Sequence, residues 1–115
     1  MKHSVNVAVI GAGYWGKNII RNFANNPKTN LVLICDSNND RAVKLRDTYS
    51  PGTAVTDSVG YVMQRDDIDA VSIVTPVYTH FDIAREALKS GKHVLIEKPM
   101  SMLYSEASKF VRLAN

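Results

Sequence analysis

Apolar residues along this chain fall into short continuous runs, and polar segments separate the runs. The runs are rich in valine and isoleucine and are too short for helices, so they predict β-strands. Four of them are clear, at residues 5–10, 31–35, 70–74 and 94–96. A shorter run at 53–56 could be a further strand. Strands without polar alternation are typical of a parallel sheet that is covered on both faces.

Apolar residues between the runs recur three or four positions apart, which is the spacing of one helix face. The apolar positions of the predicted helices lie within residues 15–23, 42–49, 59–63, 83–88 and 107–114. Strands and helices therefore alternate along the chain. This alternation predicts an α/β fold with three layers, in which a doubly wound, mostly parallel sheet lies between helices.

Small polar residues and one glycine mark the predicted helix ends. Segment 37–40 offers several N-cap candidates for the second helix, and Asp57 could cap the short third one. Thr79 and Asp82 resemble a capping box with aspartate in place of glutamate. Gly91 suits the position just after the fourth helix.

A chain of 115 residues suits a single domain with one core, and we assign residues 1–115 to it. A six-stranded sheet would need another strand, which the sequence does not supply after its last predicted helix. We therefore expect a fragment of a longer enzyme.

Charge and composition argue against several classes of protein. The chain has 14 basic and 11 acidic residues, and these are scattered, so we expect no nucleic-acid partner. No apolar stretch approaches the roughly 20 residues that span a bilayer, and no signal peptide is evident. We expect no membrane contact, a cytoplasmic location and no metal site. The one cysteine, Cys35, is expected to be a buried core residue, with a reactive thiol as the alternative.

The glycine turn, residues 11–16 (GAGYWG), follows the first predicted strand and opens the first predicted helix. Its spacing and context are those of a site for the pyrophosphate of a dinucleotide. Gly11 permits a tight turn, Gly13 lets phosphate approach the backbone, and Gly16 lets the helix pack on the sheet. Tyr14 and Trp15 are expected to contribute backbone N–H groups. The alternative is that these glycines only form a strand–helix turn.

Asp36 ends the second predicted strand, 25 residues after Gly11. A carboxylate there accepts hydrogen bonds from the adenosine ribose and repels a 2′-phosphate. Because Ser37 and Asn38 follow it, NAD is favoured over NADP, although Arg41 could swing toward a phosphate. Asp36 could instead cap the next helix, or do both.

Two further motifs end later strands, Thr75-Pro76 and Glu97-Lys98-Pro99. Ligands of doubly wound sheets bind outside the carboxyl ends of the strands, so both motifs are candidate site segments. A partly desolvated Lys98 could act as a general acid or base beside a substrate hydroxyl. From chemistry alone, a solvated lysine beside Glu97 is equally plausible.

Three segments together resemble the N-terminal domain of the glucose–fructose oxidoreductase/inositol dehydrogenase (Gfo/Idh/MocA) family. They are residues 9–18 (VIGAGYWGKN), 75–80 (TPVYTH) and 91–99 (GKHVLIEKP), and the resemblance runs along essentially the whole chain. It implies a Rossmann-type fold and an NAD(P)-dependent oxidoreductase acting on a secondary alcohol. Lys98 would be the catalytic lysine that contacts the substrate hydroxyl, and Glu97 would help hold the nicotinamide ribose.

The resemblance also implies that Thr75 and Pro76 line the nicotinamide side of the cofactor, with His80 nearby. Without it, we would assign His80 a solvated ring in the first helical turn. Val77 departs from the family, in which many members carry asparagine there, so that side-chain contact is lost.

The family's second domain, which carries most of the substrate pocket, is absent from these 115 residues. The sequences of residues 11–18 (GAGYWGKN) and 75–80 (TPVYTH) are most similar to those of members that act on nucleotide-linked sugars. The expected substrate is therefore a sugar, nucleotide sugar or cyclitol. We expect the chain to bind cofactor without turnover and to form a homo-oligomer through its uncovered surfaces. The rival hypothesis is a complete, non-catalytic nucleotide-sensing or interaction module, for which Glu97-Lys98-Pro99 would have no use.

Overall fold

The computed structural model describes residues 4–96 and 104–114. Every predicted strand and helix is present in it. The strands are β1 (Val5–Ile10), β2 (Thr29–Cys35), β3 (Ala54–Thr56), β4 (Ala70–Ile73) and β5 (His93–Ile96). The helices are α1 (Tyr14–Asn25), α2 (Asn39–Tyr49), α3 (Val59–Gln64), α4 (His80–Lys89) and α5 (Tyr104–Ala114), with a short 3₁₀ helix, η1 (Val77–Thr79).

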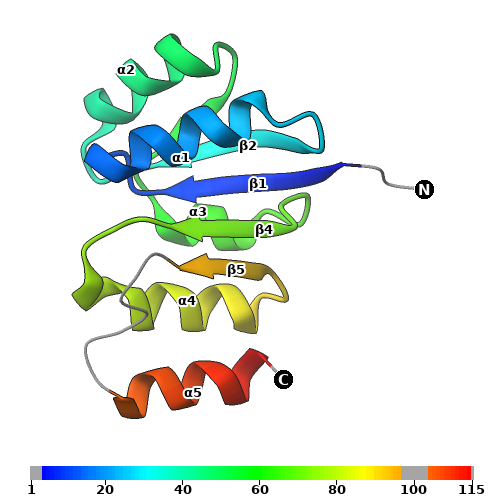
Figure 1. Ribbon diagram of the computed structural model, residues 1–115, viewed down its shortest axis with the longest axis vertical. Helices are drawn as coiled ribbons and strands as arrows, with labels where there is room; N and C mark the ends of the chain where they lie inside the picture. The colour runs from blue at the N-terminus through cyan, green and yellow to red at the C-terminus, as the bar shows by residue number, and fades with distance from the viewer. Residues whose placement is uncertain (1–3, 97–103, 115) are drawn as a thin grey trace.

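The five strands form one parallel sheet in the order β3-β2-β1-β4-β5 (Figure 1). The chain leaves β1 toward β2 and β3, then crosses back to β4 on the other side of β1. The predicted doubly wound α/β fold is thereby confirmed. The reversal of direction lies between β1 and β4, which is where sheets of this type bind their ligands.

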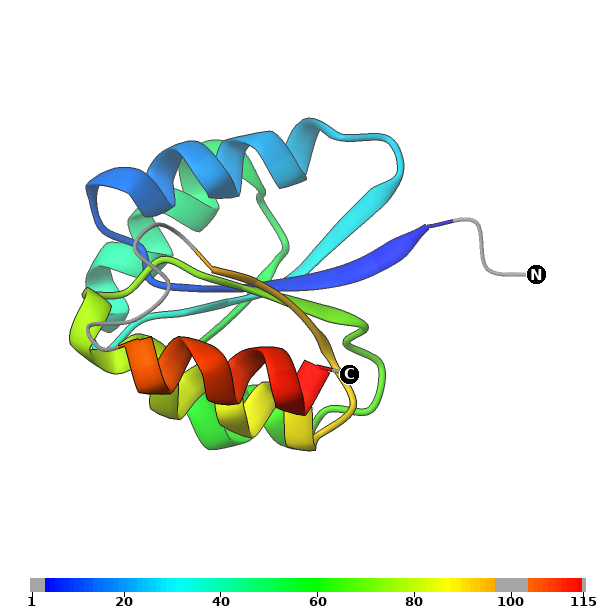
Figure 2. The same ribbon diagram turned by 60° about the horizontal axis from the view of Figure 1, so that its bottom comes forward.

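Helices cover the two faces of the sheet unequally. One face carries α1 and α2, and the other carries α3 and α4, with α5 packed against α4 (Figure 2). Between α1, α2 and the sheet lies a core cluster of Val9, Ala12, Ile20, Leu31, Ile34 and Ala42. Opposite it, a larger cluster built on Ile10, Leu33 and Ile73 packs against α3 and α4.

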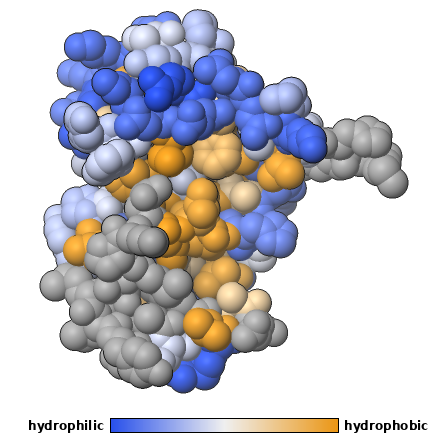
Figure 3. Space-filling view, viewed as in Figure 1, coloured by the Kyte–Doolittle hydropathy of each residue, from blue (hydrophilic) through white to orange (hydrophobic). Residues whose placement is uncertain are grey.

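On the face that carries α1 and α2, a row of side chains crosses the sheet from β1 to β5, and its member on β5 has neither helix over it. Val9 pairs with Ser72, which pairs with Leu95. Val9 and Ser72 are buried, but Leu95 is 53% exposed, because α1 and α2 lie over β1, β2 and β3. A patch of apolar surface accordingly appears over β4 and β5 (Figure 3). None of the helices in the described ranges has the length and apolar character needed to cross a membrane.

Two of the predicted helix caps are wrong. The short helix α3 is capped by Ser58, whose hydroxyl accepts from the backbone N–H of Tyr61, and not by Asp57. At α4 the hydroxyl of Thr79 makes no capping bond. It donates instead to the Pro76 carbonyl at 2.6 Å, because η1 turns the chain just before the helix.

Candidate functional site

The glycine turn leaves β1 at the carboxyl edge of the sheet, beside β2 and β4. Gly11 has a φ of +115°, and a Cβ there would lie 2.7 Å from the backbone carbon of Val74. Its own N–H donates to the Cys35 carbonyl at 2.7 Å. Only glycine fits this turn, because a side chain would be both strained and in collision with the chain after β4.

The other two glycines of the turn differ in their surroundings. A Cβ on Gly16 would collide with the carbonyl oxygen of Gly11, so α1 lies tightly on the turn. A Cβ on Gly13 would meet nothing within 4 Å. Gly13 is the N-cap of α1, and no side chain caps the helix there. The first N–H groups of α1 therefore stand beside open space, which suits an anion.

A cavity of about 580 Å³ extends from this turn along the carboxyl edge of the sheet. It brings together eight of the residues that the sequence predicted for the cofactor: Gly11, Gly13, Tyr14, Trp15, Asp36, Ser37, Thr75 and Pro76. Sequence reasoning missed several further lining residues, which are Ile10, Cys35, Asp57, Val59, Val74, Tyr78 and Thr79. Most of them follow or end β2, β3 or β4, so the rule that ligands bind at carboxyl ends could have found them.

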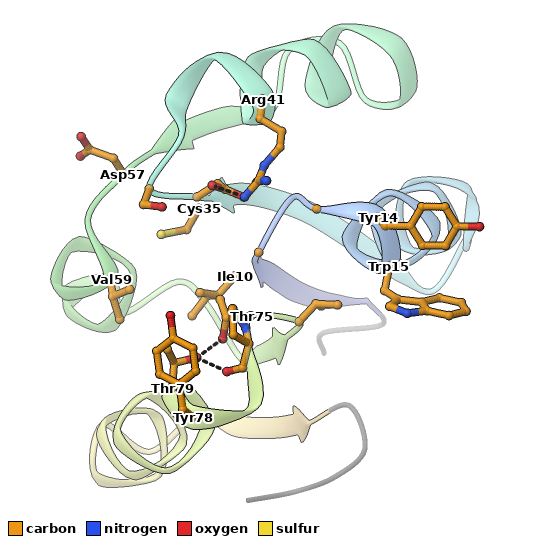
Figure 4. Close-up of a pocket in the computed structure, with 16 residues that line it drawn as sticks. Ile10, Tyr14, Trp15, Cys35, Arg41, Asp57, Val59, Thr75, Tyr78 and Thr79 are labelled. Carbon is orange, nitrogen blue, oxygen red and sulfur yellow. Dashed lines mark hydrogen bonds and ion pairs between the residues drawn. The ribbon is translucent and has the colours of Figure 1, made fainter. Parts of the chain in front are cut away.

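Asp36 is buried and its carboxylate accepts from several donors. The backbone N–H groups of Ala12 and Asn38 donate to it at 2.6 and 2.8 Å. The guanidinium of Arg41 also donates to it, and Nη2 lies 3.0 Å from Oδ1 and 2.9 Å from Oδ2 (Figure 4). The cap of α2 is Asn38, which accepts from the Arg41 N–H, so Asp36 is not the helix cap.

Cys35 lies at the base of the cavity and is buried, as the sequence predicted for a core residue. Burial, together with the nearby charges of Asp36 and Asp57, raises the pKa of its thiol from 9.0 to about 11. A raised pKa opposes formation of the thiolate, which disfavours the alternative of a reactive thiol.

Thr75 and Pro76 form the wall of the cavity that follows β4, and two side chains brace them. The Thr75 and Thr79 hydroxyl oxygens lie 2.6 Å apart. His80 donates from Nε2 to the Thr75 carbonyl at 2.8 Å. Its ring is only 2% exposed, so it is not solvated, and it is not among the residues that line the cavity. His80 supports the cavity wall from behind.

Three exposed aromatic residues surround the cavity mouth. Tyr14, Trp15 and Tyr78 are 76%, 65% and 71% exposed. The rings of Tyr14 and Trp15 pack edge to face, with their centroids 5.3 Å apart. Figure 4 shows both rings on the α1 side of the cavity and Tyr78 on the α4 side. Large apolar rings exposed beside a cavity provide contact area for a ligand or a neighbouring domain.

Glu97, Lys98 and Pro99 lie outside the described residues. Ile96 is the last described residue before them, and it ends β5. It pairs with Ile73, which ends the neighbouring strand β4. Because the two strands are parallel, the chain leaves β5 at the same edge of the sheet as the cavity.

The residues present fit a dinucleotide. Open space beside Gly13 and an uncapped helix start suit a pyrophosphate, and the buried Asp36 carboxylate suits a ribose once Arg41 yields its place. Fold and site together thus define a dinucleotide-binding domain of the Rossmann class.

Comparison with known proteins identifies the family. The family model described as "Oxidoreductase family, NAD-binding Rossmann fold" matches residues 5–115. The chain belongs to this Gfo/Idh/MocA family, as its sequence motifs predicted.

Two curated relatives illustrate the match. Glycosyl hydrolase family 109 protein 3 of Phocaeicola vulgatus is 40% identical over 106 residues, which cover 86% of this chain and 19% of the relative. A glycosyl hydrolase family 109 protein of Streptomyces coelicolor is 37% identical, covering 85% of this chain and 22% of its own length. The chain thus spans about a fifth of these relatives.

Solved structures share the fold over nearly the whole chain. GenD2 from gentamicin A biosynthesis, in complex with NAD, has a TM-score of 0.91 at 26% identity, covering 97% of this chain and 32% of that one. KijD10, a 3-ketoreductase from Actinomadura kijaniata in complex with TDP-benzene and NADP, has a TM-score of 0.89 at 28% identity, covering 96% and 35%. UDP-N-acetylglucosamine 3-dehydrogenase GnnA from Acidithiobacillus ferrooxidans has a TM-score of 0.85 at 32% identity, also covering 96% and 35%.

Proposed function

We propose that this chain is the cofactor domain of an NAD(P)-dependent oxidoreductase that acts on a secondary alcohol. The observation that carries the proposal is the open space beside Gly13 at the uncapped start of α1, inside a cavity bordered by Asp36. Family membership supports it, as do structural neighbours in complex with NAD or NADP.

Each segment of the cavity wall has a role in this proposal. The backbone N–H groups at Gly13, Tyr14 and Trp15 bind the pyrophosphate, with the positive end of the α1 dipole behind them. Asp36 and Ser37 bind the adenosine ribose, with NAD preferred over NADP. Gly11 and Gly16 keep the turn close to the sheet.

The nicotinamide half of the cofactor lies along the wall that follows β4 in this proposal. Thr75 and Pro76 border it, and His80 positions them by holding the Thr75 carbonyl. The bound nicotinamide ring supplies the hydride chemistry. Glu97 holds the ribose next to that ring.

Lys98 is the proposed acid–base group. It follows β5, which ends at the cavity edge of the sheet, and it lies in the segment GKHVLIEKP that resembles the family. A neutral amine there accepts the hydroxyl proton as the alcohol is oxidised, and the ammonium that forms returns the proton when the carbonyl is reduced. The longer protein contributes the rest of the substrate pocket, so the 115-residue chain binds cofactor without turnover.

The substrate class that we propose is a sugar, a nucleotide sugar or a cyclitol. Neighbours described as a UDP-N-acetylglucosamine 3-dehydrogenase, a 3-ketoreductase with TDP-benzene and a myo-inositol dehydrogenase support this class. All of them share the fold of this chain, and none is covered over more than about a third of its length.

Calorimetric titration with NAD+ and NADH tests the proposal, and the Gly13→Ala variant sharpens it. Gly13 has a negative φ of −81° and free space, so an alanine methyl group fits there without a collision and the variant stays folded. Its methyl group takes the place of the pyrophosphate, so NAD+ affinity falls by about tenfold or more. Gly60→Ala, on the exposed side of α3, is the matched control and binds like the unaltered chain. Folded chain that binds neither dinucleotide contradicts the proposal, and so does a Gly13→Ala variant with full affinity.

The names of the curated relatives favour a second candidate, which is glycoside hydrolysis by the longer protein. The two candidates differ in what they release. An oxidoreductase forms reduced cofactor in proportion to substrate, whereas a hydrolase releases the aglycone of a chromogenic glycoside. Measuring both with the full-length protein separates them.

A further inference from the structure

The carboxylate of Asp36, which the proposed function assigns to the adenosine ribose, is already engaged by Arg41. Two backbone N–H groups, from Ala12 and Asn38, donate to it. Arg41 adds Nε at 3.2 Å from Oδ2 and Nη2 within reach of both oxygens. A ribose would need the acceptor positions that the guanidinium occupies. The two hydroxyls of a ribose and the two nitrogens of Arg41 are therefore competitors.

Arg41 can move away from Asp36 without leaving the buried carboxylate unpaired. The Asp36 side chain is 3% exposed, whereas that of Arg41 is 50% exposed, so only the guanidinium has access to solvent. After Arg41 leaves, Ala12 and Asn38 still donate to the carboxylate, and the ribose hydroxyls replace the donors that are lost. Because the guanidinium is already half exposed and the ribose replaces its donors, the exchange leaves the buried carboxylate with hydrogen-bond partners throughout.

Arg41 also borders a second cavity that carries more positive charge. This cavity, of about 430 Å³, lies between α1 and α2, and Gly13, Tyr14 and Arg41 line both it and the main cavity. Lys17 and Lys44 contribute two further cations to its wall. Neither lysine forms an ion pair with another described residue. Arg41 thus stands between a carboxylate and a group of cations.

The two cofactors make opposite demands on this position. NAD presents two ribose hydroxyls, which are donors to Asp36. NADP presents a 2′-phosphate, which the Asp36 carboxylate repels unless a cation lies between them. The planar guanidinium can contact a carboxylate and a phosphate at once, and Lys44 can share the phosphate charge.

We propose that Arg41 is the residue that sets cofactor choice in this chain. It yields the Asp36 carboxylate to the ribose of NAD, and it lies between that carboxylate and the 2′-phosphate of NADP. The chain then binds both cofactors. Its preference depends on two free energies, the cost of displacing Arg41 from Asp36 when NAD binds and the gain from contact between Arg41 and the 2′-phosphate when NADP binds. This inference rests on the proposed function, because it concerns the same cavity.

The experiment compares the dissociation constants of NAD+ and NADP+ by calorimetry, in the unaltered chain and in Arg41→Gln. We expect NADP+ affinity to fall by about tenfold or more, since a charge-assisted phosphate contact is lost. NAD+ affinity is kept or increased, since its ribose has no guanidinium to displace. Arg41→Lys retains a cation and keeps part of the NADP+ affinity. Lys44→Gln weakens NADP+ and leaves NAD+ unchanged.

Arg21→Gln is the matched control, because Arg21 lies on the exposed surface of α1 and contacts only Asn18 among the hydrogen bonds of the described residues. Its ratio of the two constants stays that of the unaltered chain. A ratio within about twofold of the unaltered chain in both Arg41 variants overturns the inference while the proposed function stands. Folded chain that binds neither cofactor overturns both.

Discussion

The Cys35 thiol lies at the base of the cavity, and burial governs its chemistry. A pKa of about 11 in place of 9.0 lowers the thiolate fraction at pH 8 by about a hundredfold. We expect alkylation by iodoacetamide at pH 8 to be slower than that of a small thiol by at least about this factor. The rate should rise about tenfold per pH unit up to pH 11, whereas a small thiol levels off above its own pKa.

The same shift links Cys35 to stability. The pKa is higher in the folded chain than in the unfolded one, so the thiol favours folding below about pH 9. This contribution is lost as the pH rises from about 9 to 11, and urea unfolding of Cys35→Ala lacks that loss. Alkylation at pH 8 as fast as that of a small thiol would contradict the assignment.

Single residues of the candidate site were predictable where backbone geometry alone decides their place in it. Gly11, Gly13 and Gly16 follow from the turn, and Asp36 follows from the end of a strand. The contact between Asp36 and Arg41 was not predictable, because it depends on which way a long side chain turns from the first turn of α2. His80 was not predictable from its position either, since the bend at η1 is what places its ring under Thr75.

The junction between α4 and β5 depends on a lysine that is buried. Lys92 is 6% exposed, and its Nζ donates to the carbonyls of Arg65 and Ile68 at 2.7 and 3.3 Å. The lysine thereby ties the start of β5 to the loop between α3 and β4.

Lys92→Met should therefore destabilise the chain. Methionine keeps the apolar stem but leaves two carbonyls without their donor, at a cost of about 1–3 kcal/mol. Urea unfolding measures this change, and Lys28→Met on an exposed loop should stay within about 0.5 kcal/mol of the unaltered chain. Equal stability of the two variants would show that Lys92 is dispensable.

The order and kind of the elements were predictable, because apolar runs and helical spacing are properties of whole segments. The helix caps were less so. At Asp57-Ser58 two adjacent residues can both cap, and the choice falls on Ser58 because its hydroxyl reaches the Tyr61 N–H. At Thr79 the preceding 3₁₀ turn offers the hydroxyl a nearer partner in the Pro76 carbonyl. Such competition between neighbouring partners is settled by local geometry that a sequence pattern does not contain.

Over the whole molecule, the sheet is covered on one face only in part. Leu95 lies exposed on β5, at one edge of the described sheet. Apolar surface extends over β4 and β5 in Figure 3. An exposed apolar edge strand is a surface on which a second copy can pair. We expect the 115-residue chain to self-associate at high concentration.

Light scattering tests this expectation. Leu95→Lys should shift the chain toward the monomer, because a charge on an edge strand opposes pairing. Val5→Lys, at the opposite end of β1 from the site, is the matched control and should associate as before. A clean monomer of the unaltered chain at high concentration would contradict the expectation.

The chain contains a single tryptophan, and Trp15 stands 65% exposed at the mouth of the main cavity. All tryptophan emission from this molecule therefore originates beside the proposed cofactor site. A reduced nicotinamide absorbs in the range where tryptophan emits, so energy transfer would report each binding event optically. Stopped-flow fluorescence of the unlabelled chain can then measure the rates of cofactor binding and release. A slow step in binding would report the rate at which the Arg41 guanidinium leaves the Asp36 carboxylate.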